Sequence, residues 1–214
     1  MTEAASSPED LVRAVRAAGI GDERLLEAVL ATPRAAFVPA DQRTHAYRDV
    51  PLPIGHGQVT TQPSLSAMMI EGLELGGDEH VLEIGTGLGF QTALLARLAA
   101  DVVTIEMYPD LADQARRNLD RQGVREVESR VGDGSGGVPD RAPYDAIVVS
   151  AAFPDVPAPL AEQLRVGGRL VQPIGPGGRE QVVSYQRTPT GLERQRVLTL
   201  AYFVRLQGRY GFSS

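Results

Sequence analysis

The chain has 214 residues, 43% of them hydrophobic, and a formal net charge of −6 at pH 7. This size and composition predict a single domain with a substantial core, and they argue against a nucleic-acid partner, which needs clustered positive charge. Cysteine is absent, which excludes thiolate catalysis, disulfides and cysteine-bound zinc.

The start of the chain, Met1 to Asp10, has neither the basic region nor the apolar region of a signal peptide. No apolar run approaches the roughly 20 residues that span a bilayer. We therefore expect a cytoplasmic protein without membrane contact. A monomer is also expected, although no sequence feature determines the oligomeric state.

Two short amphipathic helices are predicted after a polar, mobile tail of residues 1–8. Apolar spacing from Leu11 onward indicates the first helix, which Gly19 ends. Asp22 can cap the second helix, which ends before Pro33.

The segment from Pro33 to Pro63 has little periodicity, and a loop of this length is unusual inside a compact domain. Its aromatic and aliphatic residues, such as Phe37 and Tyr47, argue for order. We interpret it as a structured active-site segment. Pro63 itself suits the first turn of a helix.

Short apolar runs alternate with helical patterns over most of the remaining chain, which predicts a parallel sheet covered on both faces. Residues 179–187 and 194–206 then predict an antiparallel pair around the turn-like residues 188–191. The sequence therefore predicts one α/β domain, with a doubly wound, mostly parallel sheet and C-terminal antiparallel strands. Residues 1–62 supply the helical cover and substrate-side segment, and residues 63–214 the cofactor-binding core.

A glycine-rich turn follows the first predicted strand of the core and opens a predicted helix. Its expected cofactor contacts are Glu83, Gly85, Thr86, Gly87 and Gly89. The spacing is G-x-G-x-G and not the G-x-G-x-x-G of a dinucleotide pyrophosphate site. The acid before the turn would repel phosphate but suits a ligand that carries an ammonium and a sulfonium.

Acidic residues also end the next two predicted strands, where open α/β sheets bind ligands. Glu106, followed by Met107, is placed to accept hydrogen bonds from ribose hydroxyls. Asp133, followed by Gly134, can reach an adenine amino group. Together these residues favour S-adenosylmethionine over NAD as the cofactor. No P-loop lysine is present, which excludes a Walker-type site.

The chain resembles the protein-L-isoaspartate O-methyltransferase family from Arg34 to the last strand. The stretch Val81 to Phe90 resembles the family's cofactor turn, and 132–134 its adenine-side motif. The most specific stretches lie ahead of the turn and are Phe37-Val38-Pro39, Ala46 to Gly55, and Gly57 to Pro63.

The resemblance implies a Rossmann-like methyltransferase fold and methyl transfer from S-adenosylmethionine, with S-adenosylhomocysteine as product. The acceptor would be the α-carboxylate of L-isoaspartyl residues in damaged proteins and peptides. The resulting ester collapses to a succinimide, whose hydrolysis returns some normal aspartate.

One departure from the family's pattern concerns the predicted catalytic residue. Thr61 stands where the family usually carries serine; it keeps the hydroxyl but restricts χ1. Thr60, at a usually apolar position, can share its role, and Gln62, Pro63 and His56 complete the predicted substrate site.

The expected mechanism needs no general base, because a carboxylate with an unperturbed pKa near 4 is already ionised at neutral pH. We expect Thr61 and nearby backbone amides to hold it, and alignment can supply roughly 7–11 kcal/mol. Asp49 is expected to order the loop, since its charge opposes an anionic ligand. The scattered histidines predict no metal site.

Two alternatives remain open on the sequence alone. The same chemistry could act on an aspartyl or isoaspartyl peptide natural product or a small carboxylic acid, for which Thr61 is the motive. A cofactor-binding module that has lost catalysis is the other alternative, against which the acids at 83, 106 and 133 argue.

Overall fold

The computed structural model describes residues 6–213. Residues 1–5 of the predicted tail lie outside the described residues, and the first helix already begins at Pro8, with Ser7 as its N-cap. A capping box between Ser7 and Asp10 satisfies backbone donors at this helix start. The tail was therefore predicted too long, since Ser7 and Pro8 already belong to the start of the first helix.

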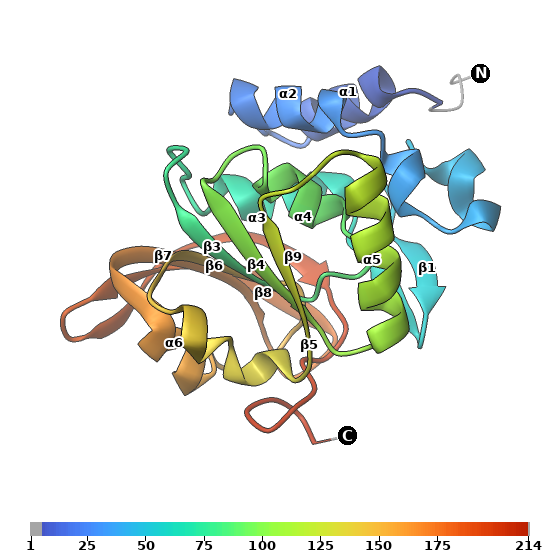
Figure 1. The fold of residues 1–214 in the computed structure, drawn as a ribbon. Helices are drawn as coiled ribbons and strands as arrows, with labels where there is room; N and C mark the ends of the chain where they lie inside the picture. Colours follow the sequence, from blue (N-terminus) through green and yellow to red (C-terminus); the bar gives the residue numbers. More distant parts are fainter. Residues whose placement is uncertain (1–5, 214) are drawn as a thin grey trace.

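Helices cover a central sheet (Figure 1). The α-helices are α1 (Pro8–Ala17), α2 (Glu23–Ala31), α3 (Pro63–Glu71), α4 (Phe90–Leu95), α5 (Pro109–Arg121) and α6 (Ala158–Gln163). Short 3-10 helices are η1 (Arg34–Phe37), η2 (Ala40–His45), η3 (Gly134–Gly136) and η4 (Pro139–Arg141). No helix among the described residues is long and apolar enough to cross a membrane.

The strands form a small hairpin and one large sheet. The hairpin consists of β1 (Leu52–Gly55) and β2 (Gln58–Thr60). The large sheet contains β3 (His80–Ile84), β4 (Asp101–Glu106), β5 (Val127–Val131), β6 (Tyr144–Val149), β7 (Leu164–Ile174), β8 (Arg179–Thr188) and β9 (Gly191–Tyr202).

The order in the large sheet is β5-β4-β3-β6-β7-β8-β9. Strands β3 to β7 pair in parallel, and β8 and β9 add antiparallel at one edge. This topology confirms the predicted mostly parallel sheet and its C-terminal antiparallel pair.

The sheet has an apolar core on each of its two faces, because successive residues of a strand point to opposite sides. On β3, Val81 packs with the core that includes α1 to α4, whereas Leu82 packs with the core that includes Leu160 of α6. Both faces of β3, β4 and β6 are therefore buried, as the continuous apolar runs predicted, whereas the edge strand β5 is partly exposed.

The second predicted N-terminal helix is confirmed together with its cap. Asp22 caps α2 by accepting hydrogen bonds from the backbone nitrogens of Arg24 and Leu25, at 2.9 and 3.4 Å. The helical sequence pattern runs over residues 157–165, but α6 ends at Gln163, because Leu164 pairs with Tyr144 and begins β7. Strand pairing overrides helical spacing at that boundary.

Candidate active site

A cavity lies at the carboxyl ends of β3, β4 and β6, the edge at which open parallel sheets bind ligands. Four groups of residues form most of its wall. They are Ile54 with Gln58–Thr61 from the hairpin segment, Ile84–Leu88 from the glycine turn, Ile105–Tyr108 from the end of β4, and Val204–Gln207 from the C-terminal segment.

The glycine turn needs its glycines for backbone conformation. Gly85, Gly87 and Gly89 have φ of 94°, 56° and 91°, a region that other residues rarely adopt. Gly85, Thr86 and Gly87 line the cavity, as their predicted cofactor contacts require. Gly89 lies behind the turn, where an added Cβ would approach Cγ of Leu119 on α5 to 3.3 Å.

Glu106 lies in the cavity wall with its carboxylate held by backbone donors. Its Oε2 accepts from the nitrogen of Gly87 at 2.8 Å, and its Oε1 accepts from the nitrogen of Tyr108 at 3.1 Å. Each carboxylate oxygen has further accepting capacity, so Glu106 can bind hydroxyl donors from a ligand. Met107 and Gly134, also predicted cofactor contacts, line the same cavity.

Glu83 is fully buried beneath the turn and is not part of the cavity wall. Its carboxylate accepts hydrogen bonds from Thr92 Oγ1 at 2.5 Å, Thr104 Oγ1 at 2.7 Å and Gln91 Nε2 at 3.1 Å. Burial nevertheless raises the pKa of Glu83 to about 7. Its direct contact with the cofactor stays a prediction, whereas Gln91, which it holds, does line the cavity.

Asp133 is engaged by the C-terminal segment. Its Oδ1 accepts from the nitrogen and hydroxyl of Ser135, at 2.9 and 2.6 Å, and its Oδ2 accepts from the nitrogen of Arg209 at 2.7 Å. Burial acts to raise the pKa of Asp133, but these hydrogen bonds lower it overall. The carboxylate lies behind Gly134 and outside the cavity wall, so its contact with adenine stays a prediction.

A buried arginine organises the segment ahead of the glycine turn. Arg34 donates to the backbone oxygens of Ala46, Arg48 and Val50 and, at 2.8 Å, to Thr60 Oγ1. Burial lowers the pKa of Arg34 to about 10, so the guanidinium remains charged at neutral pH. The segment predicted to be ordered is thus built around a cation that the sequence reasoning did not single out.

Asp49 orders the same segment, as predicted. Its Oδ1 accepts from the backbone nitrogen of Ser64 at 2.8 Å, and its Oδ2 accepts from Gln62 Nε2 at 2.8 Å. Pro63 between them opens α3 and is buried; it lines neither this cavity nor the second one described below, and its contact with substrate stays a prediction. Asp49 therefore fixes the join between the loop and α3.

A second cavity adjoins the first. Its wall includes Gln62, Leu65 and Pro51 from the N-terminal side and the stretch Leu200–Val204 at the end of β9. Thr61 lines both cavities and so lies at their junction. The two predicted threonines therefore occupy different positions, since Thr60 lines the first cavity only.

His56 lies in the tight turn of the β1–β2 hairpin and lines neither cavity. Its ring stacks on Tyr108, with ring centroids 4.3 Å apart, and its Nε2 pairs with Asp110 at 2.9 Å. The predicted contact between His56 and substrate stays a prediction, and the structure gives this side chain other partners.

Several wall residues were missed by the sequence reasoning. Ser150 follows β6, as Gly85 follows β3, so its position at a strand end was available as a signal. The stretch Val204–Gln207 had no such signal in the sequence, because it reaches the cavity through isolated bridges such as Ala152 to Arg205.

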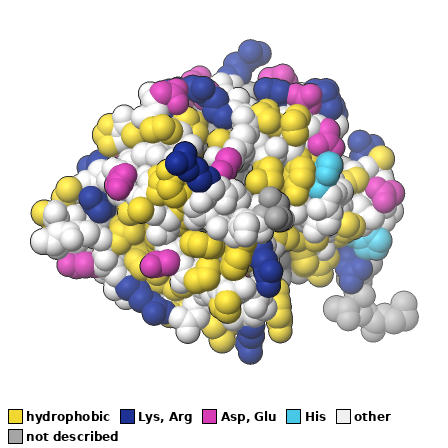
Figure 2. All heavy atoms as spheres, turned by 90° about the horizontal axis from the view of Figure 1, so that it is seen from below, with side chains coloured by type: hydrophobic (Ala, Val, Ile, Leu, Met, Phe, Trp, Pro, Cys, Tyr) yellow, Lys and Arg dark blue, Asp and Glu magenta, His cyan; other side chains and the backbone are white. Residues whose placement is uncertain are grey.

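On the face seen from below in Figure 2, basic and acidic side chains are interspersed among hydrophobic ones. No metal-binding cluster occurs among residues 6–213.

A family model described as Protein-L-isoaspartate(D-aspartate) O-methyltransferase (PCMT) matches residues 6–211. A protein-L-isoaspartate O-methyltransferase of Methanoculleus marisnigri is 50% identical over 198 residues, which cover 92% of this chain and 90% of the relative. The Myxococcus xanthus relative of the same name is 50% identical over 194 residues, covering 89% and 92% of the two chains.

Solved structures agree with these relatives. A protein-L-isoaspartate O-methyltransferase matches with a TM-score of 0.83 at 29% identity, covering 95% of this chain and 67% of that chain. A putative enzyme of the same name from Plasmodium falciparum, solved with S-adenosyl-L-homocysteine, matches with a TM-score of 0.78 at 18% identity, covering 94% and 98%.

The mostly parallel sheet, the glycine turn and the acid at the next strand end define an S-adenosylmethionine-dependent methyltransferase. Identity of 50% over most of both chains goes well beyond a shared fold. The chain belongs to the protein-L-isoaspartate O-methyltransferase family, a family of carboxyl methyltransferases. The predicted family, fold and enzyme class are thereby confirmed.

Proposed function

We propose that the first cavity binds S-adenosylmethionine and that the second binds the isoaspartyl residue of a damaged protein. Methyl transfer to the α-carboxylate then takes place at the junction beside Thr61. One observation carries this assignment, namely that the two cavities share part of their walls. The shared residues are Val59, Thr61, Ser150 and Val204.

The lining of the first cavity suits the cofactor. Glycines bring the backbone of the turn to its wall, and Glu106 offers acceptors that suit the ribose hydroxyls. Glu83, Glu106 and Asp133 form no ion pair with a cation among the described residues. Glu106 is the one of these three acids that lies in the cavity wall, where its carboxylate suits a ligand with positive charge.

The chain's own residues have to align the reacting groups. When bound, the cofactor supplies a methyl group made electrophilic by the sulfonium. The substrate carboxylate is ionised at neutral pH and needs no base, so the protein must hold it in line and exclude water. Residues at the cavity junction are placed for this alignment.

The two threonines have different hydrogen-bond duties. Thr60 Oγ1 accepts from Arg34 and from the backbone nitrogen of Leu52, at 2.8 and 3.2 Å, which uses the accepting capacity of its oxygen within the segment but not its hydroxyl proton. Thr61 lies at the junction, and we assign its hydroxyl to donate to the substrate carboxylate. Gln62, held by Asp49, completes the substrate side.

A methyl-transfer assay tests the proposal with two peptides that differ only in an isoaspartyl or aspartyl link. We expect the isoaspartyl peptide alone to be labelled, as a base-labile methyl ester. Equal labelling of both peptides, or labelling only of small carboxylic acids, would contradict the proposed substrate. Cytoplasmic location, a monomeric state and the lack of a nucleic-acid partner stay predictions. Light scattering can test the monomeric state.

A further inference from the structure

The β1–β2 hairpin (Leu52–Thr60) forms one wall of the cofactor cavity. Ile54, Gln58 and Thr60 line the cavity from this hairpin. Ile54 also reaches the glycine turn, since a Cβ added at Gly87 would lie 3.4 Å from its Cδ1. The position of the hairpin therefore determines how closely this wall approaches the glycine turn.

The hairpin is held at its two ends by different contacts. At its base, Arg34 donates to Thr60 Oγ1. At its tip, His56 reaches α5, which Figure 1 shows beside the hairpin. His56 Nε2 donates to Asp110, and the ring stacks on Tyr108 with an interplanar angle of 12°.

At the hairpin tip, a histidine has a backbone conformation that glycine adopts more readily. His56 has a φ of 51° and stands between Gly55 and Gly57, whose φ values are 103° and 67°. Such strain persists where surrounding contacts over-determine it. The hydrogen bond from His56 also lowers the pKa of Asp110, so this carboxylate stays ionised to lower pH and remains an acceptor for the ring.

We propose that His56 is a positioning residue for the cofactor, which fastens the hairpin tip to the start of α5 and slows cofactor release. This inference rests on the proposed function of the first cavity. Tyr108 connects the two features, because it lines the cavity while it stacks with His56. His56 itself is 40% exposed and lines neither cavity, so it acts through its neighbours.

The test measures binding and release of S-adenosylhomocysteine by calorimetry and stopped-flow fluorescence. The variants are His56→Ala, His56→Phe, which keeps a ring over Tyr108, and Asp110→Asn. Asp113→Asn on the same helix is the matched control, since Asp113 is 50% exposed and, among the residues that the structure describes, pairs only with Arg116.

We expect His56→Ala to weaken binding by about three- to tenfold through faster release, the size of one stack and one exposed pair. His56→Phe should recover part of the loss, and Asp113→Asn should match the wild type. A double variant of His56→Ala and Asp110→Asn should lose less than the sum of the single effects.

Steady-state kinetics separate this role from a structural one and from a substrate contact. The KM for S-adenosylmethionine should rise in His56→Ala, while kcat and the KM for isoaspartyl peptide stay within twofold. Unchanged release, or a rise in peptide KM alone, would overturn the proposal. If the wild type itself binds no S-adenosylhomocysteine, the proposed function of the cavity fails instead.

Discussion

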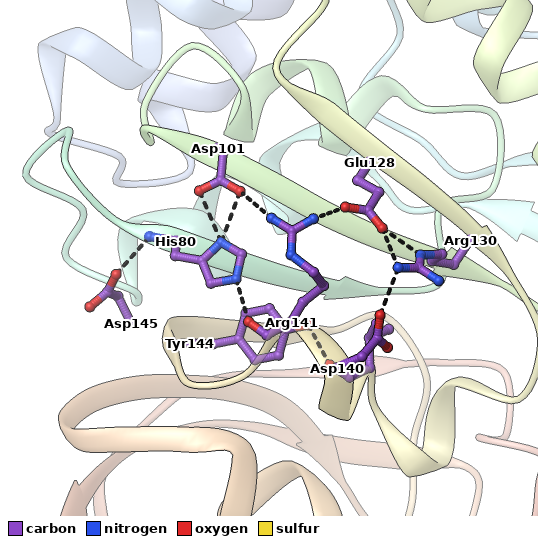
Figure 3. Close-up of polar contacts among 9 residues, drawn as sticks. His80, Asp101, Glu128, Arg130, Asp140, Arg141, Tyr144 and Asp145 are labelled. Atoms are coloured by element: carbon purple, nitrogen blue, oxygen red, sulfur yellow. Dashed lines mark hydrogen bonds and ion pairs between the residues drawn. The ribbon is translucent and has the colours of Figure 1, made fainter.

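Acidic side chains gather at both edges of the parallel sheet, but their partners differ. At the amino edge, His80 begins β3 and its Nδ1 lies 2.9 Å from both carboxylate oxygens of Asp101 at the start of β4. His80 Nε2 donates to the backbone oxygen of Arg141 at 2.8 Å (Figure 3). Every polar atom of this ring therefore has a protein partner.

The charges at the amino edge continue as a chain of alternating sign. Arg141 pairs with both Asp101 and Glu128, and Arg130 joins Glu128 to Asp140 (Figure 3). At the carboxyl edge, by contrast, Glu83, Glu106 and Asp133 accept only from backbone amides and neutral side chains.

The two edges of one sheet therefore differ in whether their charged side chains are paired with each other or left available to a ligand. Charges that neutralise each other leave little potential for a ligand, whereas the carboxylate of Glu106, held by backbone amides, keeps its negative field. The amino edge is therefore expected to matter for folding and the carboxyl edge for the cofactor. Substituting an acidic residue at each edge in turn can test whether the two edges differ in this way.

The largest expected effect is that of Glu106→Ala on S-adenosylhomocysteine binding. Two charge-assisted hydrogen bonds to the ribose are worth roughly 1.5–3 kcal/mol each, so the Kd should rise at least about a hundredfold. Glu128→Ala at the other edge is the control and should leave the Kd unchanged in calorimetry. Equal losses in both variants would remove the distinction between the edges.

A second prediction uses the pH dependence of stability at Glu83. Burial raises the pKa of Glu83 from 4.5 to about 7, so the folded state binds the proton more tightly than the unfolded state. Its contribution to stability is complete below pH 4.5 and is lost as the pH rises through 7.

The loss amounts to about 3 kcal/mol at pH 8 relative to pH 4.5, given the shift at Glu83. Glu83→Gln removes the titrating group, so urea denaturation at several pH values should show a flatter profile in the variant. Parallel profiles in variant and wild type would show that Glu83 does not titrate in this range.

The third prediction concerns the cavity junction. Thr61→Val removes the hydroxyl while keeping the branched shape, and kcat/KM for isoaspartyl peptide should fall by about ten- to hundredfold, the range of one hydrogen bond to a charged group. Thr61→Ser should retain activity, and neither variant should alter S-adenosylhomocysteine affinity by more than twofold. Full activity in Thr61→Val would assign the carboxylate to other donors.

Local patterns predicted the sheet and the glycine turn because each depends on neighbours in sequence. Alternating apolar runs determine buried strands, and Gly85 and Gly87 are needed by backbone conformation alone. The cap at Asp22 has the same local origin, since its partners lie within three residues.

Long-range placement was beyond such reasoning. His56 meets Asp110 across 54 residues, and Arg209 reaches Asp133 across 76. Neither pair leaves a periodic or motif signal, because each depends on how the hairpin and the C-terminal segment pack on the finished sheet. Arg34 was missed for a related reason. Its acceptors are backbone oxygens, which every residue type provides, so the sequence does not reveal them.

The smallest expected effect is at the amino edge, in His80→Phe. The imidazole of His80 stacks on Tyr144 with ring centroids 4.6 Å apart; the variant keeps a ring there but removes the two hydrogen bonds of the imidazole. The free energy of unfolding in urea should fall by about 1–2 kcal/mol. Because His80 lies at the far end of β3 from the glycine turn, the Kd for S-adenosylhomocysteine should stay unchanged. A loss of affinity comparable with that of Glu106→Ala would mean that the two edges are coupled through the strand, and that folding and binding are not separable in this sheet.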